Sequence, residues 1–158
     1  MLETANRPKT IRGITDLKAE VGRELGISPW YDMSQARITA FAEATGDRYW
    51  IHVDPVRSAQ TPLGATIAHG LFTLSLGPQL TDTIVQFEGF KGRLNYGYDR
   101  VRFPAPLPVD SRIRMRLQVV DLAEDPGSVR VTLLQTFERE NEVKPVCIAS
   151  QVLRLATR

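Results

Sequence analysis

A chain of 158 residues with a mass of 17.7 kDa has the size of one domain. Its composition, 42% hydrophobic and 24% charged, excludes a disordered, fibrous or disulfide-rich protein. A net charge of only +2 argues against a nucleic-acid partner. No apolar run reaches the ~18 residues of a membrane span, and the N-terminus lacks the apolar core of a secretory signal. We therefore expect no membrane partner and a cytoplasmic location.

Two helices are expected early in the chain, after an N-terminus of residues 1–10 that is expected to be flexible. The first helix begins near Thr15 and ends at Gly26. It carries three apolar residues at four-residue spacing, Leu17, Val21 and Leu25. The second begins after Ser34 and ends at Gly46, with Ile38, Phe41, Ala42 and Thr45 on one face.

The middle of the chain predicts a long loop followed by a buried helix. Residues 47–66 show no periodicity and contain two prolines and Gly64, and a loop of that length inside a domain is usually functional. From Ile67 to Val85, apolar residues surround most of a helical wheel, which is typical of a buried helix. Pro78 predicts a kink or a break within that helix.

The pattern of the second half of the chain predicts a β-sheet. Alternating apolar and polar residues predict antiparallel strands at 94–103, 112–120, 129–138 and 146–155. The alternation shifts phase near Asp99–Arg100, which predicts a bulge there. We expect residues 1–158 to form one α+β domain, a curved antiparallel sheet around one buried helix.

Asp47 and His52 are the first candidates for chemistry. Side chains five residues apart on a helix point ~140° apart, so their convergence requires an irregular backbone. A carboxylate and an imidazole on one turn can hold a single water, and imidazole exchanges protons near neutral pH. The alternative is that Asp47 caps a helix end and His52 is a hydrogen-bonded surface residue. Which of the two would act as base stays open.

The segment Ala68, His69 and Gly70 opens the expected buried helix. The first N–H groups of a helix lack internal partners, and glycine allows close approach to the backbone. Such donors stabilise an oxygen that gains negative charge. The alternative is a helix start with glycine for tight packing and a structural His69. Cys147 lies in an expected strand without a local partner, so it is expected to be a core residue, and no Cys/His metal framework is expected.

Three blocks of sequence resemble the MaoC-like dehydratase family, the (R)-specific enoyl-CoA hydratases, and most of all its nodulation-protein-N-like subgroup. They are residues 41–55 with the following Ser58, residues 67–70 and residues 95–106. The resemblance covers roughly residues 10–155. Tyr49 and Trp50 stand where the broader family has Asn-Pro, and their rings suit an acyl pocket or a dimer contact.

The resemblance implies a hot-dog fold, a homodimer and reversible hydration of trans-2-enoyl thioesters to (R)-3-hydroxyacyl thioesters. Asp47 and His52 then form the catalytic pair, the Gly70 amide binds the thioester carbonyl, and Asn95 takes a supporting role. No metal or redox cofactor is implied, since coenzyme A or acyl carrier protein is part of the substrate. Ala68 and His69 belong to the same expected substrate-binding segment as Gly70.

Two other functions remain open from the sequence. One is a hot-dog acyl-CoA thioesterase, and the other is a non-catalytic acyl-CoA-binding module. Six arginines, Arg93, Arg100, Arg102, Arg112, Arg114 and Arg116, are crowded into the centre of the chain. They are interpreted as solvated strand faces, with contact to coenzyme A phosphates as the alternative.

Overall fold

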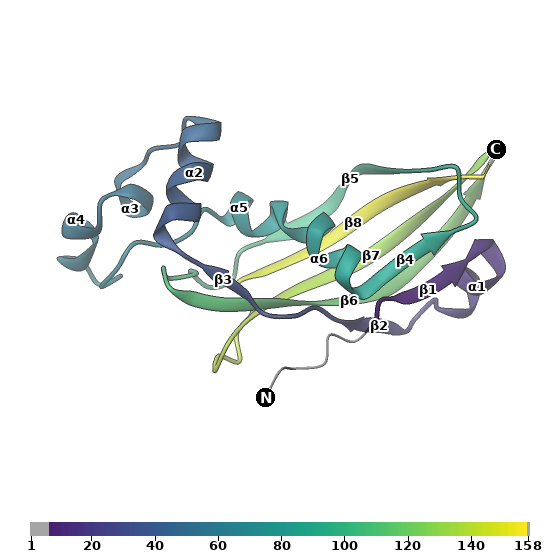
Figure 1. Ribbon diagram of the computed structural model, residues 1–158, viewed down its shortest axis with the longest axis horizontal. Helices are drawn as coiled ribbons and strands as arrows, with labels where there is room; N and C mark the ends of the chain where they lie inside the picture. The colour runs from purple at the N-terminus through teal and green to yellow at the C-terminus, as the bar shows by residue number, and fades with distance from the viewer. Residues whose placement is uncertain (1–6, 158) are drawn as a thin grey trace.

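Six strands form the main sheet of the protein (Figure 1). The structure is a computed structural model that describes residues 7–157. The strands are β2 (Glu24–Ile27), β3 (Tyr31–Met33), β5 (Gly92–Arg102), β6 (Ser111–Asp125), β7 (Ser128–Arg139) and β8 (Cys147–Ala156). All pairs are antiparallel, in the order β2-β6-β7-β8-β5, and β3 pairs with β6. The four strands expected in the second half of the chain are therefore confirmed.

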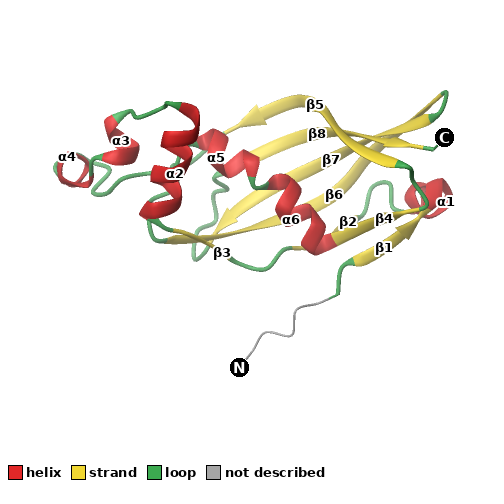
Figure 2. Cartoon of the chain, turned by 45° about the horizontal axis from the view of Figure 1, so that its top comes forward, coloured by secondary structure: helices red, strands yellow, loops and turns green. Residues whose placement is uncertain are grey.

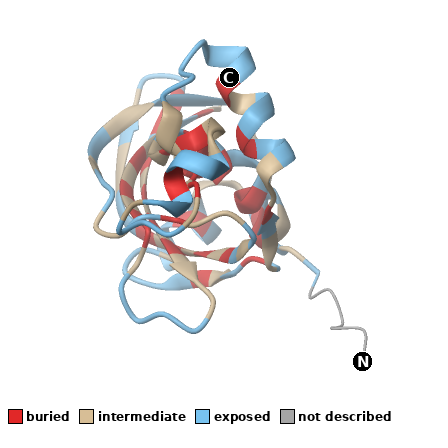
Figure 3. Ribbon diagram, turned by 90° about the vertical axis from the view of Figure 1, so that its left-hand side faces the viewer, coloured by how far each residue is buried: buried red, intermediate tan, exposed pale blue. Residues whose placement is uncertain are grey.

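The alternation that predicts these strands also fixes which face is buried. In β6 the residues Ile113, Met115, Leu117 and Val119 are fully buried, and the arginines between them lie on the other face. The register of β5 against β8 shifts between Tyr98 and Arg100, where the bulge is expected, and again between Asn95 and Gly97. Figure 3 shows the sheet curving around its buried side.

The expected buried helix is two helices, α5 (Gly70–Ser75) and α6 (Gly77–Ile84), which lie across the concave face of the sheet (Figure 2). Pro78 stands in the first turn of α6, so the expected break is confirmed. A Cβ atom on Gly77 would lie 3.0 Å from the Gln135 amide, which explains glycine at the break. The helix begins later than expected, because the Ala68 N–H donates to the Leu107 carbonyl and leaves the backbone extended.

The N-terminal region corrects two expectations. The first helix is α1 (Gly13–Ala19); the chain then turns through Gly22, whose φ of 83° is left-handed, so Leu25 lies in β2. Residues 9 and 10 belong to β1 (Lys9–Arg12), which pairs in parallel with β4 (Val85–Glu88), so the expected flexibility is wrong for these two. Residues 1–6 lie outside the described residues.

Three helices gather beyond one end of the sheet, around the start of α5 (Figures 1 and 2). The helix α2 (Gln35–Thr45) has the expected limits, with Ser34 accepting the Arg37 N–H and Gly46 left-handed at φ 78°. The expected loop 47–66 is only partly a loop, because it contains α3 (Trp50–Val53) and α4 (Pro55–Ala59). Asp54 and Pro55 explain α4, since they form its N-cap and first turn.

Two further features follow from burial and length. Cys147 is buried, and desolvation raises the pKa of its thiol to about 12, which suits the expected core role. Within residues 7–157, every helix is too short or too polar to cross a bilayer.

Candidate active site

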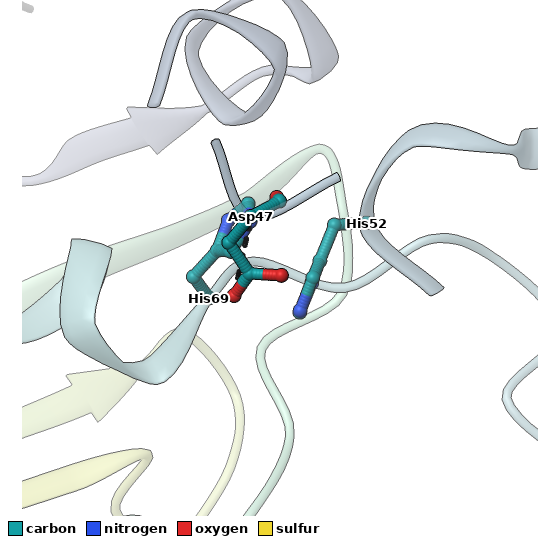
Figure 4. A group of neighbouring side chains, drawn as sticks. All are labelled: Asp47, His52 and His69. Carbon is teal, nitrogen blue, oxygen red and sulfur yellow. Dashed lines mark hydrogen bonds and ion pairs between the residues drawn. The ribbon is translucent and has the colours of Figure 1, made fainter. Parts of the chain in front are cut away.

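Asp47, His52 and His69 converge from three segments that meet where α5 begins (Figure 4). Asp47 follows the left-handed Gly46 at the end of α2, His52 lies in α3, and His69 is the residue before α5. Their carboxylate and ring-nitrogen atoms lie within 4.8 Å of one another. The sharp turn after Gly46 is what brings together two side chains that one continuous helix would separate.

His52 is buried, and one hydrogen bond determines its tautomer. Its Nδ1 lies 2.7 Å from the carbonyl oxygen of Ile67. Because a carbonyl only accepts, Nδ1 carries the hydrogen, and Nε2 keeps its lone pair. Burial lowers the pKa of His52; His69 lowers it further, whereas the bond to Ile67 and the Asp47 carboxylate oppose the decrease. The imidazole is therefore neutral near pH 7 and offers a free acceptor.

Asp47 is the accessible member of the cluster, with 58% of its side chain exposed. One carboxylate oxygen, Oδ1, accepts the Tyr49 N–H at 3.4 Å. The other, Oδ2, lies 4.0 Å from His69 Nε2 and has no closer partner among the described residues. The carboxylate thus has an oxygen available for a water molecule beside His52.

His69 lies behind this pair and is 3% exposed. Its Nε2 donates to the Asp47 carbonyl oxygen at 2.9 Å, and its ring stacks on that of His52 with 3.7 Å between centroids. His69 also lines the cavity that contains Asp47 and Gly70, so its expected place in the substrate-binding segment stays a prediction. The same donation means that binding a metal through Nε2 would require His69 to change its tautomer.

Two cavities adjoin the cluster and share His52, Gly70 and Phe103 in their walls. The larger one, of about 300 Å³, also includes Ala68 and Thr73; the smaller one, of about 210 Å³, includes Asp47 and His69. Gly70 is the first residue of α5, so its N–H has no acceptor within the helix. A Cβ on Gly70 would come within 2.9 Å of the Phe103 ring, so that ring occupies the space that a side chain at position 70 would need.

Gln35, Thr66 and Phe103 were missed as site residues by reasoning from the sequence. Gln35, the first residue of α2, donates to the His52 carbonyl at 2.8 Å and accepts the hydroxyl of Thr66. It therefore ties α3 to the chain that leads into α5. The sequence gives no signal for these bonds, because Gln35 lies 17 residues from His52 and 31 residues from Thr66 along the chain.

The side chains of the remaining expected residues lie apart from the cluster, although the backbone N–H of Tyr49 contacts Asp47. Tyr49 and Trp50 pack against each other at 5.7 Å, and Arg57 stacks on Trp50; neither aromatic ring lines the two cavities. Asn95 lies on β5 beside α6, where its Oδ1 accepts the Gln151 amide and it lines a separate cavity of about 200 Å³. The structure thus brings together Asp47, His52, His69, Ala68 and Gly70 but not these three.

The six central arginines divide into two groups. Four are in ion pairs with acidic residues: Arg93, Arg112, Arg114 and Arg116. Arg100 and Arg102, just before Phe103 on β5, have no such pair among residues 7–157. The ion-paired arginines fit the interpretation as surface residues of the strands. For Arg100 and Arg102, contact with coenzyme A phosphates stays a prediction.

Comparison with known proteins identifies the family. A model of the "MaoC like domain" matches residues 16–139. The chain belongs to the MaoC-like family. Over 147 residues it is 43% identical to 3-hydroxyacyl-thioester dehydratase Z of Mycobacterium tuberculosis, covering 92% of this chain and 97% of that one. It is 40% identical to nodulation protein N of Rhizobium meliloti, covering 88% of each.

Solved structures confirm the expected hot-dog fold of this MaoC-like chain. A monoamine oxidase regulatory protein from Archaeoglobus fulgius superposes with a TM-score of 0.76 at 20% identity, covering 98% of both chains. An (R)-hydratase from Pseudomonas aeruginosa superposes with a TM-score of 0.69 at 21% identity, covering 88% of this chain and 83% of that one. The expected enzyme class, a hydro-lyase, agrees with the dehydratase and hydratase names among the relatives.

Proposed function

We propose that this MaoC-like protein catalyses the reversible (R)-specific hydration of trans-2-enoyl thioesters to 3-hydroxyacyl thioesters. The observation that carries the proposal is the Nδ1–H bond of His52 to Ile67, which leaves a neutral ring with a free Nε2 beside the Asp47 carboxylate. A relative that shares 43% of its residues is a 3-hydroxyacyl-thioester dehydratase by name.

The substrate binds where the two cavities meet. The N–H of Gly70 donates to the thioester carbonyl and polarises the conjugated double bond. The carbonyl lies at the positive end of α5, although a helix this short adds little beyond the single hydrogen bond. One water molecule is held between the free oxygen of Asp47 and Nε2 of His52, facing C3 of the substrate.

The reaction needs only the atoms of that water and the substrate. Nε2 of His52 takes one proton as the water oxygen bonds to C3, and the electron pair of the double bond moves to C2 and onto the carbonyl oxygen. The Gly70 N–H stabilises this enolate, and the Asp47 carboxylate stabilises the imidazolium. The imidazolium then returns its proton to C2, which restores the neutral ring. Dehydration follows the same steps in reverse.

The carrier, the assembly and the location are further parts of the proposal. Coenzyme A or acyl carrier protein is bound through its phosphates by Arg100 and Arg102, which precede Phe103 and have no ion pair among residues 7–157. Two copies of the chain form a homodimer, and the protein is cytoplasmic.

A single assay distinguishes this function from its rivals. Purified protein is mixed with crotonyl-CoA while the absorbance of the conjugated thioester and the release of free thiol are followed together. Hydration predicts loss of the absorbance without thiol and an (R)-configured product on chiral analysis. Release of thiol would instead indicate a thioesterase. Binding of enoyl-CoA without turnover, across a range of chain lengths, would indicate a binding module.

A further inference from the structure

His69 is the one ionisable group of the cluster to which the proposed reaction gives no task. Its ring packs against the rings of Phe41 and His52, with 5.0 Å and 3.7 Å between ring centroids, and against the backbone of Asp47. The titratable groups clustered with it among the described residues are Asp47 and His52. An apolar residue would fill such a buried position without leaving a polar atom unpaired.

The imidazole of His69 is only half satisfied. Nε2 donates to the Asp47 carbonyl oxygen, whereas Nδ1 is buried and lacks a hydrogen-bond partner among the described residues. The opposite tautomer is worse, because it would set a lone pair against the carbonyl oxygen and bury an unpaired N–H. The contacts therefore select the tautomer with the hydrogen on Nε2.

This tautomer links the two catalytic residues. Its N–H holds the carbonyl of Asp47, and its ring face supports the ring of His52, whose own Nδ1 is held by Ile67. Two imidazole rings stacked at 3.7 Å cannot both be charged without strong repulsion. A cation on His69 would therefore disfavour the proton that His52 takes from water.

We propose that His69 is a positioning residue. As a neutral Nε2–H donor, it fixes the Asp47 backbone and the His52 ring so that the Asp47 carboxylate and Nε2 of His52 bind the same water. The inference rests on the proposed function and adds a residue to its machinery. The Nε2–H of His69 is used by the Asp47 carbonyl and its ring face packs on His52, so its effect is exerted through these two residues.

Two substitutions of similar size separate the hydrogen bond from simple space filling. His69→Gln keeps an N–H donor near the position of Nε2, whereas His69→Met has none. We expect His69→Met to lower kcat by about 10- to 100-fold with KM changed little, since small misplacements of catalytic groups have costs of that order. We expect His69→Gln to recover most of the loss. Equal kcat values for the two variants, with both folded by thermal melting, would overturn the proposal.

A second measurement does not depend on activity. The chain has only two histidines, so ¹⁵N NMR of the imidazoles is assigned directly by comparing the intact protein with His69→Gln. We expect His69 as the Nε2–H tautomer and His52 as the Nδ1–H tautomer, with His52 becoming a mixture in His69→Met. A hydrogen on Nδ1 of His69 contradicts the inference. Because these spectra need no substrate, they test His69 even if Asp47 and His52 prove not to be catalytic.

Discussion

At the scale of single residues, the direction of one hydrogen bond assigns the role of His52. The Ile67 carbonyl can only accept, so the ring must donate from Nδ1 and keep Nε2 free. The sequence pattern predicts Asp47 and His52 as a pair, but not which is the base, because the deciding carbonyl lies fifteen residues away along the chain. For the same reason His69 could be placed near the site but not given its contact with Asp47.

The pH dependence of the reaction tests this role. The base must be unprotonated, so activity is lost as the pH falls through the pKa of His52. Burial lowers that pKa, so we expect the acid limb of kcat/KM to have its midpoint below about 6.5, the ordinary value for imidazole. A limb at or above that value, measured with crotonyl-CoA from pH 5 to 8 at constant ionic strength, would contradict the assignment.

At the scale of elements, the start of α5 depends on the absence of a side chain at Gly70. Helix α2 could be predicted closely, because Ser34 and Gly46 are local signals for its two ends. The parallel pair β1–β4 could not, because it depends on a distant partner, as Lys9 does on Val85. The helices α3 and α4 could not either, because they have only 4 and 5 residues and are too short to give a periodic pattern. The packing of Phe103 on Gly70 also joins distant segments, since it brings the chain just after β5 against α5.

Gly70→Ala tests that packing. The added methyl group would meet the Phe103 ring at 2.9 Å, so the ring or the amide must move. We expect turnover of crotonyl-CoA to fall by about 10- to 100-fold, because the carbonyl donor is displaced. The double variant with Phe103→Leu is expected to recover part of the loss. If Gly70→Ala alone retains full activity, the packing of Phe103 on residue 70 does not position the amide.

Gln35 tests how α2 supports the site. Gln35→Leu would leave the His52 carbonyl and the Thr66 hydroxyl without their partner. We expect the free energy of unfolding, measured in urea, to fall by about 1–3 kcal/mol. Gln60→Leu is the control, because Gln60 is exposed and its side chain makes no hydrogen bond within the described chain. Equal stability of the two variants would show that the Gln35 bonds contribute nothing.

At the scale of the whole molecule, β5 is an open edge of the main sheet. It pairs with β8 on one side only, and Leu94 and Tyr96 on it are 61% and 60% exposed. A long edge strand with exposed apolar residues is a template for pairing with another chain. This edge is therefore where we expect the proposed homodimer to form.

Light scattering after size-exclusion chromatography tests the dimer. We expect a mass near twice 17.7 kDa for the intact chain and a monomer for the double variant Leu94→Lys, Tyr96→Lys, since lysines on both copies repel. Val143→Lys, in the exposed turn before β8, is the control and should remain dimeric. A double variant that keeps the dimer mass would place the interface elsewhere.

Rates of Asp47→Asn, His52→Gln and their double variant test the central claim most directly. If both side chains hold one water, each single change should lower hydration of crotonyl-CoA by at least about 100-fold. The double variant should then be little worse than either, because groups that act as one unit are not additive. Full activity in either single variant, or losses that multiply in the double one, would contradict a shared water.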